Sequence, residues 1–343
     1  MDNCEYRKEA AMEQQELYLN MAGARWKVST PYPVEVGENY LPFLCEPGEA
    51  DCSYSFTLGK PELSEPMLSE EYLTVWRADD GFFLERVPMV TSEPCACIHI
   101  FDADPLHVRG YIYPGREERF RLLNNALDVG CVEYMLSALH VINLHSSFIR
   151  FQNGAILFTA PSGTGKSTQA ELWERYTDAE QLNGDRSVIR NVNGVWTAYG
   201  FPFAGSSQIF RNESAPIRAI VVLRQAPENT IERLGPGTAF RLIYSETAIQ
   251  RWHDAGHTAV VDQLLQLCRD VPVYMLRCTP DERAVRLLQT TLSMEESKCL
   301  LNEGKPCWSS ICTVVPTSPV SRFPAHSSLR PCAAWHARCA MCA

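Results

Sequence analysis

Residues 148–168 constrain the fold of this chain more than any other stretch of its sequence. They read FIRFQNGAILFTAPSGTGKST, two short apolar runs joined by Asn153-Gly154 and followed by a turn rich in glycine. Asn-Gly between alternating runs is the strongest short-range signal for a β-hairpin. The sequence therefore predicts two antiparallel strands, the second of which leads directly into the glycine-rich turn.

Residues 160–167, Ala-Pro-Ser-Gly-Thr-Gly-Lys-Ser, fit the phosphate-binding loop, with Ala160 in place of the usual first glycine. Glycines let successive backbone N–H groups turn toward phosphate oxygens, and the next helix points its positive end at the same place. In such a loop Lys166 reaches the β- and γ-phosphates and the Ser167 hydroxyl ligates Mg²⁺. The other interpretation is a glycine-rich strand–helix turn without a ligand. We expect ATP to be bound by Ser162, Gly163, Thr164, Gly165, Lys166, Ser167 and Thr168.

The composition describes an ordinary soluble protein that has room for two domains. The chain has 343 residues, of which 45% are hydrophobic, and a net charge of −10. This negative charge argues against nucleic acid or an anionic membrane surface as the main partner. No apolar run reaches the about 18 residues of a membrane span, and the polar N-terminus does not resemble a secretory signal. We expect a cytoplasmic protein whose cysteines are mostly buried, reduced thiols.

Changes in composition and in hydrophobic pattern divide the chain into three parts. Residues 1–116 are expected to form a mainly β module, and its residues 2–19 are compatible with a short polar helix. Within it, residues 24–115 read as mainly antiparallel strands, with a hairpin turn at Asp79-Asp80-Gly81. Residues 117–299 are expected to form the nucleotide-binding domain. Residues 300–343 hold five cysteines and many prolines and serines, and we expect them to be disordered.

The central part predicts an α/β fold with a mixed sheet. A helix over residues 117–142 has one apolar stripe, and residues 167–176 form the helix after the loop. Asn191 to Gly194 turn the chain into a second hairpin. A buried strand follows at 217–223, a shorter one at 230–234 and another at 271–277. Further helices are predicted at about 237–251, 257–269 and 281–292.

Phosphoryl transfer needs a carboxylate beside the loop. Asp185 is the best candidate, because it lies beyond one helix at the start of a strand and can return beside the phosphates. It would act as general base or hold Mg²⁺, against the alternative of an ordinary turn aspartate. His145 lies in the strand that pairs with the loop strand and would face the γ-phosphate, or else be a half-buried strand histidine. The loop at residues 200–207 and Arg211 are weaker candidates for an acceptor site.

The tail contains one further candidate site. Cys332, His336, Cys339 and Cys342 have a spacing typical of zinc ligands. We favour an unstructured tail over a zinc site, because no hairpin pattern accompanies the cluster.

These motifs together resemble the C-terminal domain of HPr kinase/phosphorylase. The resemblance runs from His145 through the Asn-Gly turn and the glycine-rich loop to Leu-Asn-Gly-Asp-Arg at 182–186, and covers roughly residues 140–295. It implies a nucleotide-binding core shared with ATP-dependent phosphoenolpyruvate carboxykinases, in which a hairpin precedes the loop. It also implies that Lys166 and Ser167 bind phosphate and Mg²⁺, that Asp185 is the general base and that His145 contacts the γ-phosphate. Members of that family carry paired aspartates where this chain has Gly184-Asp185.

Three functions are compatible with this sequence. The first is a Mg²⁺-dependent kinase that transfers the ATP γ-phosphate to a hydroxyl of a protein, peptide or small molecule, acting as a monomer or a homo-oligomer. The second is an ATP-binding sensor or scaffold that has lost turnover. The third is phosphoenolpyruvate carboxykinase chemistry, which is disfavoured because the metal ligands and substrate arginines of those enzymes are not found here.

Overall fold

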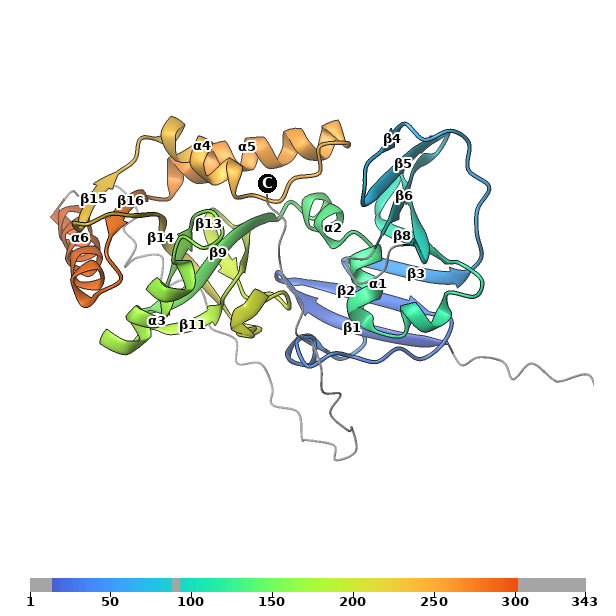
Figure 1. The fold of residues 1–343 in the computed structure, drawn as a ribbon, viewed down its shortest axis with the longest axis horizontal. Helices are drawn as coiled ribbons and strands as arrows, with labels where there is room; N and C mark the ends of the chain where they lie inside the picture. Colours follow the sequence, from blue (N-terminus) through green and yellow to red (C-terminus); the bar gives the residue numbers. More distant parts are fainter. Residues whose placement is uncertain (1–13, 88–92, 302–343) are drawn as a thin grey trace, which may run out of the picture.

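Two eight-stranded mixed sheets and six α-helices make up the part of the chain that the computed structural model describes, residues 14–87 and 93–301. The first sheet lies on the right of Figure 1 and the second on the left, with α4 and α5 above the second sheet. The protein is therefore a mixed α/β protein, as its sequence predicts. Within the same ranges no helix has both the length and the apolar character that a membrane span needs.

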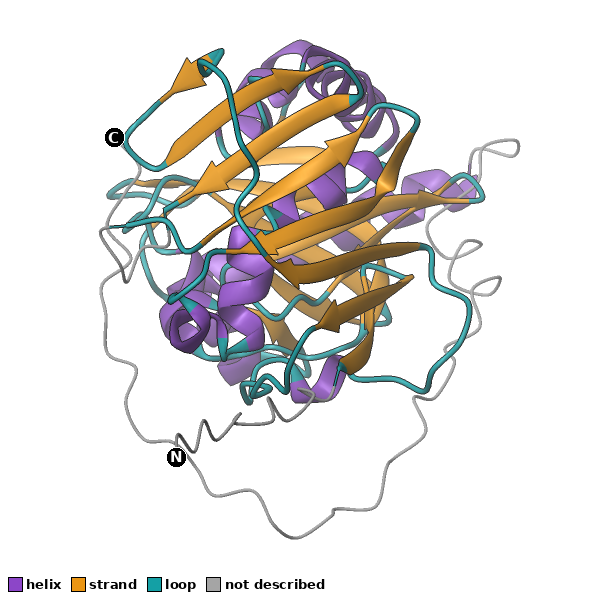
Figure 2. Cartoon of the chain, turned by 90° about the vertical axis from the view of Figure 1, so that its right-hand side faces the viewer, coloured by secondary structure: helices purple, strands orange, loops and turns teal. Residues whose placement is uncertain are grey.

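The first sheet has the strand order β1-β2-β3-β8-β7-β6-β5-β4, and Figure 2 views the molecule from its side. The pairs β2–β3 and β3–β8 are parallel and the others are antiparallel, so this module is mainly but not wholly antiparallel. The hairpin predicted at Asp79-Asp80-Gly81 is confirmed by the pairing of Ala78 with Gly81. The strands are β1 (Gln15–Met21), β2 (Ala24–Thr30), β3 (Cys52–Leu58), β4 (Leu68–Ser69), β5 (Leu73–Ala78), β6 (Gly81–Arg86), β7 (Ala96–Phe101) and β8 (Asp104–Ile112).

The expected helix over residues 2–19 is wrong where the structure describes it. Residues 15–21 form strand β1, which turns at Ala22-Gly23 and pairs antiparallel with β2. Both turn residues have positive φ, 55° and 68°. Leu19 and Met21 are buried in the core while Asn20 between them is exposed, which is the period-two pattern of a strand. Residues 2–13 lie outside the described ranges.

The helix predicted over residues 117–142 is broken into short pieces. A 3₁₀ turn η2 (Glu117–Phe120) precedes α1 (Leu123–Val129) and α2 (Val132–Ala138). The break falls at Gly130-Cys131, where Cys131 adopts a left-handed φ of 51°. A side chain at Gly130 would lie 2.9 Å from the Tyr54 ring, so the first sheet closely abuts the break. The predicted apolar stripe does exist, but it packs on the first sheet from two helices.

The second sheet has the order β10-β9-β12-β13-β14-β16-β15, with β11 beside β9 and an additional pairing of β10 with β14. Strands β9, β12, β13, β14 and β10 therefore close into a ring. The hairpin at Asn153-Gly154 is confirmed by the antiparallel pairing of β9 with β10, and the second hairpin by Val192 opposite Val195. The strands are β9 (Ile142–Phe151), β10 (Gly154–Thr159), β11 (Glu180–Asn183), β12 (Arg186–Val192), β13 (Val195–Tyr199), β14 (Ser214–Gln225), β15 (Thr230–Arg233) and β16 (Val273–Cys278).

Helices cover both faces of this sheet. Along β10, Ala155 and Leu157 belong to the core shared with α4 (Pro236–Ser245) and α5 (Asp254–Asp270). Ile156 and Phe158 point to the opposite core, shared with α3 (Lys166–Tyr176) and α6 (Glu282–Leu301). Because both faces are covered, the strand before the glycine-rich loop is apolar throughout. Six of the seven free cysteines that the structure describes are buried, as expected.

The two sheets are joined by packing as well as by the chain. Val188 and Phe201 belong to the core of the first sheet although they lie in the second part of the sequence. The Arg190 Nη1 donates to the carbonyl oxygens of Ala22 and Gly23 at 3.2 and 3.1 Å. The helices α1 and α2 follow residue 116 but also pack on the first sheet, so the packing does not mark a boundary at that residue. A domain boundary near residue 116 remains a proposal.

Trp173 tests the core beneath the loop helix. Its side chain is fully buried, with its ring centroid 5.1 Å from that of Phe151. We expect Trp173→Ala to lower the free energy of unfolding by about 3–5 kcal/mol in urea titrations, because it leaves a large cavity. The control Met294→Ala, at a side chain 59% exposed on α6, should change it by less than about 0.5 kcal/mol. Equal losses in the two variants would contradict this packing.

Candidate active site

The glycine-rich loop connects β10 to α3. Gly163 and Gly165 have φ values of +76° and +116°, and a side chain built on either would meet nothing within 4 Å. Their conformation rather than a lack of space therefore requires glycine. Gly165 is the N-cap of α3, an 11-residue helix, and Ser162 and Gly163 are exposed. The loop thus presents backbone N–H groups and a helix N-terminus on the surface, an arrangement suited to an anion.

Lys166 lies against the base of this loop. Its side chain is 8% exposed, and its Nζ donates to the carbonyl oxygen of Ala160 at 2.8 Å and to that of Pro161 at 3.4 Å. Ala160 is buried and is not among the residues with positive φ, so its backbone does not require the usual glycine. The lysine therefore spans the loop from its last residues to its first.

Asp185 lies where β9 exchanges one neighbouring strand for another. Along this edge, β11 pairs with β9 at residues 148–150 and β12 pairs with it at residues 142–145. Between them the chain kinks at Gly184-Asp185, and the Asp185 carbonyl accepts from the Ser146 backbone N–H at 3.0 Å. The kink places the Asp185 side chain beside His145 of β9.

Buried Asn183 fixes the shape of the kink. Its Oδ1 accepts from the backbone N–H groups of Asp185 and Arg186 at 2.9 and 2.8 Å. Its Nδ2 donates to the carbonyl oxygens of Phe201 and Phe203 at 2.7 and 3.1 Å. One amide thus holds both the turn that carries Asp185 and the loop at residues 200–207. Asn183 was not predicted as a site residue, although Asn-Gly-Asp is typical of such a side-chain-capped turn.

The loop at residues 200–207 closes over Gly184. A side chain built on Gly184 would come within 1.8 Å of the Ser207 Oγ. A side chain built on Gly205, in the 3₁₀ turn η3 (Gly205–Ser207), would likewise lie 3.0 Å from the Asp185 Cβ. This chain therefore has no room for a second carboxylate beside Asp185 in its observed packing. Arg211 lies at 3.8 Å from Glu180 in an exposed ion pair.

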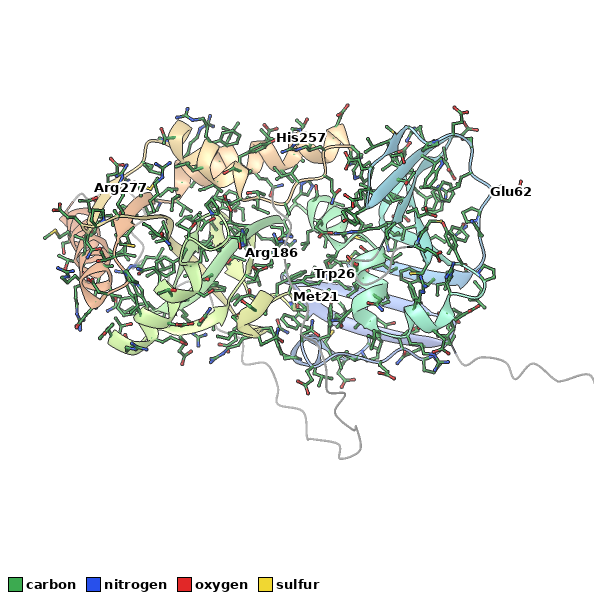
Figure 3. All side chains as sticks on the ribbon, in the orientation of Figure 1. Met21, Trp26, Glu62, Arg186, His257 and Arg277 are labelled. Carbon is green, nitrogen blue, oxygen red and sulfur yellow. The ribbon has the colours of Figure 1, made fainter. Side chains whose placement is uncertain are left out.

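His145 lies between two carboxylates. Its Nε2 is 3.4 Å from the Asp185 Oδ1, and its Nδ1 is 3.3 Å from the Glu246 Oε2. Arg186, its cross-strand partner on β12, pairs with the Asp185 Oδ2 at 3.3 Å. Figure 3 labels Arg186 near the middle of the molecule, where the two sheets approach each other. Glu246 was not predicted as a site residue, because a single glutamate after a helix forms no motif.

The charges around Asp185 determine its protonation. Burial acts to raise the pKa of Asp185, but the hydrogen bond from His145 and the positive charges of Arg186, His145 and Lys166 together hold it below its ordinary value. The carboxylate is therefore ionised at neutral pH, as a general base must be.

Potential metal ligands are sparse. Within the described ranges no group of three or more histidine, cysteine, aspartate or glutamate residues is arranged to hold a metal ion. Ser167 is partly exposed at the start of α3, which fits a hydroxyl ligand to Mg²⁺, and Asp185 stays a predicted second ligand. A magnesium ion here would take its other ligands from phosphate oxygens and water. The four candidate zinc ligands of the tail lie outside the described residues.

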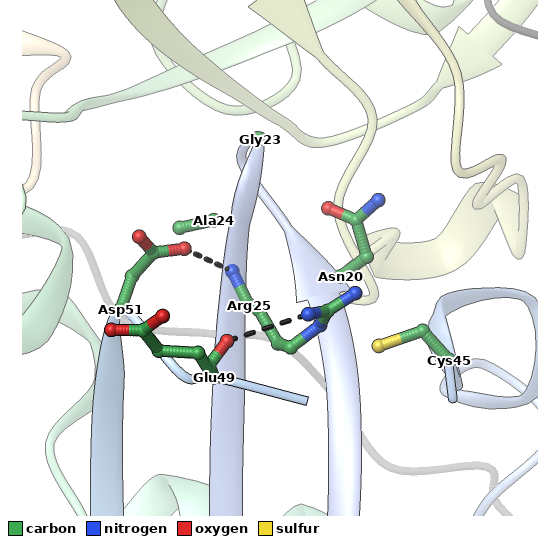
Figure 4. A pocket seen from close by; sticks show the side chains of 7 residues that line it. All are labelled: Asn20, Gly23, Ala24, Arg25, Cys45, Glu49 and Asp51. Carbon is green, nitrogen blue, oxygen red and sulfur yellow. Dashed lines mark hydrogen bonds between the residues drawn. The ribbon is translucent and has the colours of Figure 1, made fainter. Parts of the chain in front are cut away.

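A hollow of about 450 Å³ lies on the first sheet and not at the glycine-rich loop. Figure 4 shows Arg25 at its centre, where the backbone N–H donates to the Asp51 Oδ2 at 2.7 Å and the Nη1 approaches the Glu49 carbonyl at 3.4 Å. Arg25 thus already donates hydrogen bonds to Asp51 and Glu49. The lining residues are Asn20, Gly23, Ala24, Arg25, Cys45, Glu49 and Asp51.

Comparison with known proteins assigns the chain to a family. The family model described as SynChlorMet cassette protein ScmC matches residues 111–284, just over half of the 343 residues, and this range includes the loop, Asp185, His145 and Glu246. The chain therefore belongs to the ScmC family. No curated protein matches it.

The solved structure of the Hpr(Ser) kinase/phosphatase from Coxiella burnetii has a weak likeness to this chain. The alignment covers 47% of this chain and 99% of the other, at 12% identity and a TM-score of 0.28. A TM-score this low supports no inference about fold or activity.

The contact of Gly184 with Ser207 can be tested by substitution. We expect Gly184→Ala to lower the free energy of unfolding by about 1–3 kcal/mol, because the added methyl group overlaps the Ser207 side chain. Denaturant unfolding measures the loss, and adding Ser207→Gly should recover part of it. Gly237→Ala on α4 is the matched control, since a side chain built there meets nothing. A Gly184→Ala variant as stable as this control would show that the loop does not press on Gly184.

Proposed function

We propose that this protein binds ATP and is a Mg²⁺-dependent, HPr-kinase-like enzyme that transfers the γ-phosphate to a hydroxyl of a protein, peptide or small-molecule acceptor. One observation carries the proposal most directly. A loop with two left-handed glycines and a lysine at its base follows β10, whose last residue, Thr159, donates its hydroxyl to the His145 carbonyl at 2.9 Å, and the ring of His145 lies 3.4 Å from the half-buried Asp185.

The loop residues would bind the nucleotide. Backbone N–H groups of residues 163–167 would donate to phosphate oxygens, and the N-terminus of α3 would stabilise their negative charge. The Lys166 Nζ, now on the Ala160 carbonyl, would move to the β- and γ-phosphates. Ser167 and Asp185 would hold Mg²⁺, which supplies charge neutralisation of the phosphates when bound.

Asp185 would accept the proton of the acceptor hydroxyl. The hydroxyl oxygen attacks the γ-phosphorus, the bond from that phosphorus to the β–γ bridging oxygen breaks, and ADP leaves with the electron pair. His145 donates to Asp185 and would also contact the γ-phosphate. Since both roles need a defined ring orientation, the neighbours of His145 bear on its function.

A second candidate function is supported by the packing at Gly184. Gly184 leaves this chain a single carboxylate where the kinases that it resembles carry two, and Ser207 fills the space beside Gly184. An ATP-binding sensor or scaffold without turnover would be consistent with that loss. Tight binding of Mg·ATP without ADP release, in the presence of a native extract, would favour the sensor over the kinase.

Lys166 tests nucleotide turnover. We expect Lys166→Ala to reduce the rate of ADP release from Mg·ATP by roughly 100-fold or more. The substitution removes the positive charge that would stabilise the transferring phosphoryl group. Lys60→Ala, at an exposed lysine of the first sheet, is the control and should keep the parental rate. Both variants should melt at similar temperatures. A Lys166→Ala protein with normal turnover would rule out the loop as the ATP site.

Asp185 tests the transfer step separately from binding. We expect Asp185→Asn to slow transfer of label from γ-labelled ATP to extract components by roughly 10²- to 10⁴-fold, since the base is lost. The dissociation constant of a fluorescent ATP analogue should stay within about threefold, because the loop is unchanged. Asp262→Asn, at an exposed aspartate on α5, serves as the control. Full transfer by Asp185→Asn would exclude Asp185 as the base.

A further inference from the structure

We propose that Glu246 is a positioning residue that fixes the imidazole ring of His145 so that its Nε2 faces Asp185. The catalytic meaning of this inference rests on the proposed function. Its geometric content, a ring orientation set by Glu246, stands on contacts within the protein and can be tested without turnover.

Glu246 reaches His145 because of the way the edge of β9 is filled. On this edge β10 pairs with β9 as far as Thr159 opposite Ser146, and the glycine-rich loop then departs. The chain after α4 takes the next places along the same edge. The His145 backbone N–H donates to the Glu246 carbonyl at 2.9 Å, and the Ala248 N–H donates to the Asn143 carbonyl at 2.9 Å. Glu246 is therefore held directly beside the start of the loop.

The side chains continue this arrangement. Glu246 and His145 are 13% and 17% exposed, so water competes little for their contact. The His145 Nδ1 lies 3.3 Å from the Glu246 Oε2, while the Nε2 on the far side of the ring lies 3.4 Å from the Asp185 Oδ1. A carboxylate only accepts hydrogen bonds, so the ring nitrogen facing Glu246 must carry a hydrogen. A carboxylate that holds one nitrogen in this way determines where the other nitrogen points.

Other charged groups at the ring do not duplicate this role. Arg186 approaches from β12 but pairs with the Asp185 Oδ2, and Lys166 acts on Asp185 from the loop. The His145 backbone carbonyl accepts from the Thr159 Oγ1 at 2.9 Å, a contact that holds the main chain and not the ring. Without Glu246, the ring would lose its hydrogen-bond acceptor at Nδ1, and its contact with Asp185 would loosen.

The side chain of Glu246 has no evident second task in the fold. The backbone N–H of Glu246 caps α4 on the carbonyl oxygens of Ile243 and Tyr244, and its carbonyl holds the His145 N–H. Both contacts survive substitution of the side chain. Glu246→Gln should therefore leave stability nearly unchanged. It exchanges the charged acceptor for a neutral amide, which holds the Nδ1 hydrogen less strongly and can turn an N–H toward the ring instead.

The first measurement separates catalysis from binding. We expect Glu246→Gln to lower kcat for Mg·ATP-dependent transfer to extract components by about 10- to 100-fold, as losses of orienting partners do. KM for Mg·ATP should change by less than about threefold. Glu228→Gln, at an exposed glutamate between β14 and β15, is the matched control and should behave as the parent. A Glu246→Gln enzyme with parental kcat would overturn the positioning role.

A double-mutant cycle tests whether Glu246 acts through His145. If it does, adding Glu246→Gln to His145→Ala should cost no further activity, because the ring to be oriented is absent. Costs that multiply in the double variant would show an independent role for Glu246 and overturn the inference.

Ring spectra distinguish failure of this inference from failure of the proposed function. In protein labelled with ¹⁵N-histidine, the His145 ring signals, assigned with His145→Ala, should move in Glu246→Gln and stay in Glu228→Gln. Absence of transfer by the parental protein would overturn the kinase and with it the catalytic meaning of Glu246, while moved ring signals would still support the orientation. Unmoved ring signals would overturn the positioning of His145, whatever the activity.

Discussion

The candidate site depends on the hydrogen bonding of one strand, β9, and on the points where its neighbours change. On one edge β10 ends at Ser146 and the segment after α4 continues from His145. On the other edge β11 gives way to β12 across the kink at Gly184-Asp185. At both changes regular pairing is interrupted, and side chains such as Asn183 and Thr159 satisfy the backbone instead. The glycine-rich loop, Asp185 and Glu246 are therefore all held by the same short part of β9, around His145 and Ser146.

Packing around Gly184 connects this site to the first sheet. The loop at residues 200–207 lies on Gly184 and Asp185 on one side, and on the other its Pro202 carbonyl accepts from the Asn39 Nδ2 at 3.1 Å. Tyr40 also packs edge-on against Phe203, with ring centroids 6.4 Å apart. The first sheet thus supports the loop that closes over the carboxylate without itself supplying a group to the site. This gives the β module a structural connection to Asp185 that its own sequence does not suggest.

The parts of the fold that were predicted correctly depend on local chemistry. Asn153-Gly154 and Asn193-Gly194 specify tight hairpins whatever surrounds them, and the helix after the loop follows from glycine, lysine and the apolar residues of α3. The predictions that were wrong depend on partners distant in sequence. Residues 15–21 become a strand because β2 pairs with them, and the helix predicted over 117–142 breaks where the ring of Tyr54 crowds Gly130. No local pattern contains either partner.

The same division holds for the site. The sequence by itself determined the glycine-rich loop with Lys166, because the conformation of a turn or loop depends on residues adjacent in the chain. It also indicated Asp185 and His145 as the polar residues expected near the loop. Only the tertiary structure decided that Glu246 faces His145, 101 positions away, and that Ser207 leaves Gly184 without room for a side chain. Strand pairing and core packing bring such residues together, and these depend on the shape of the whole chain rather than on any segment of it.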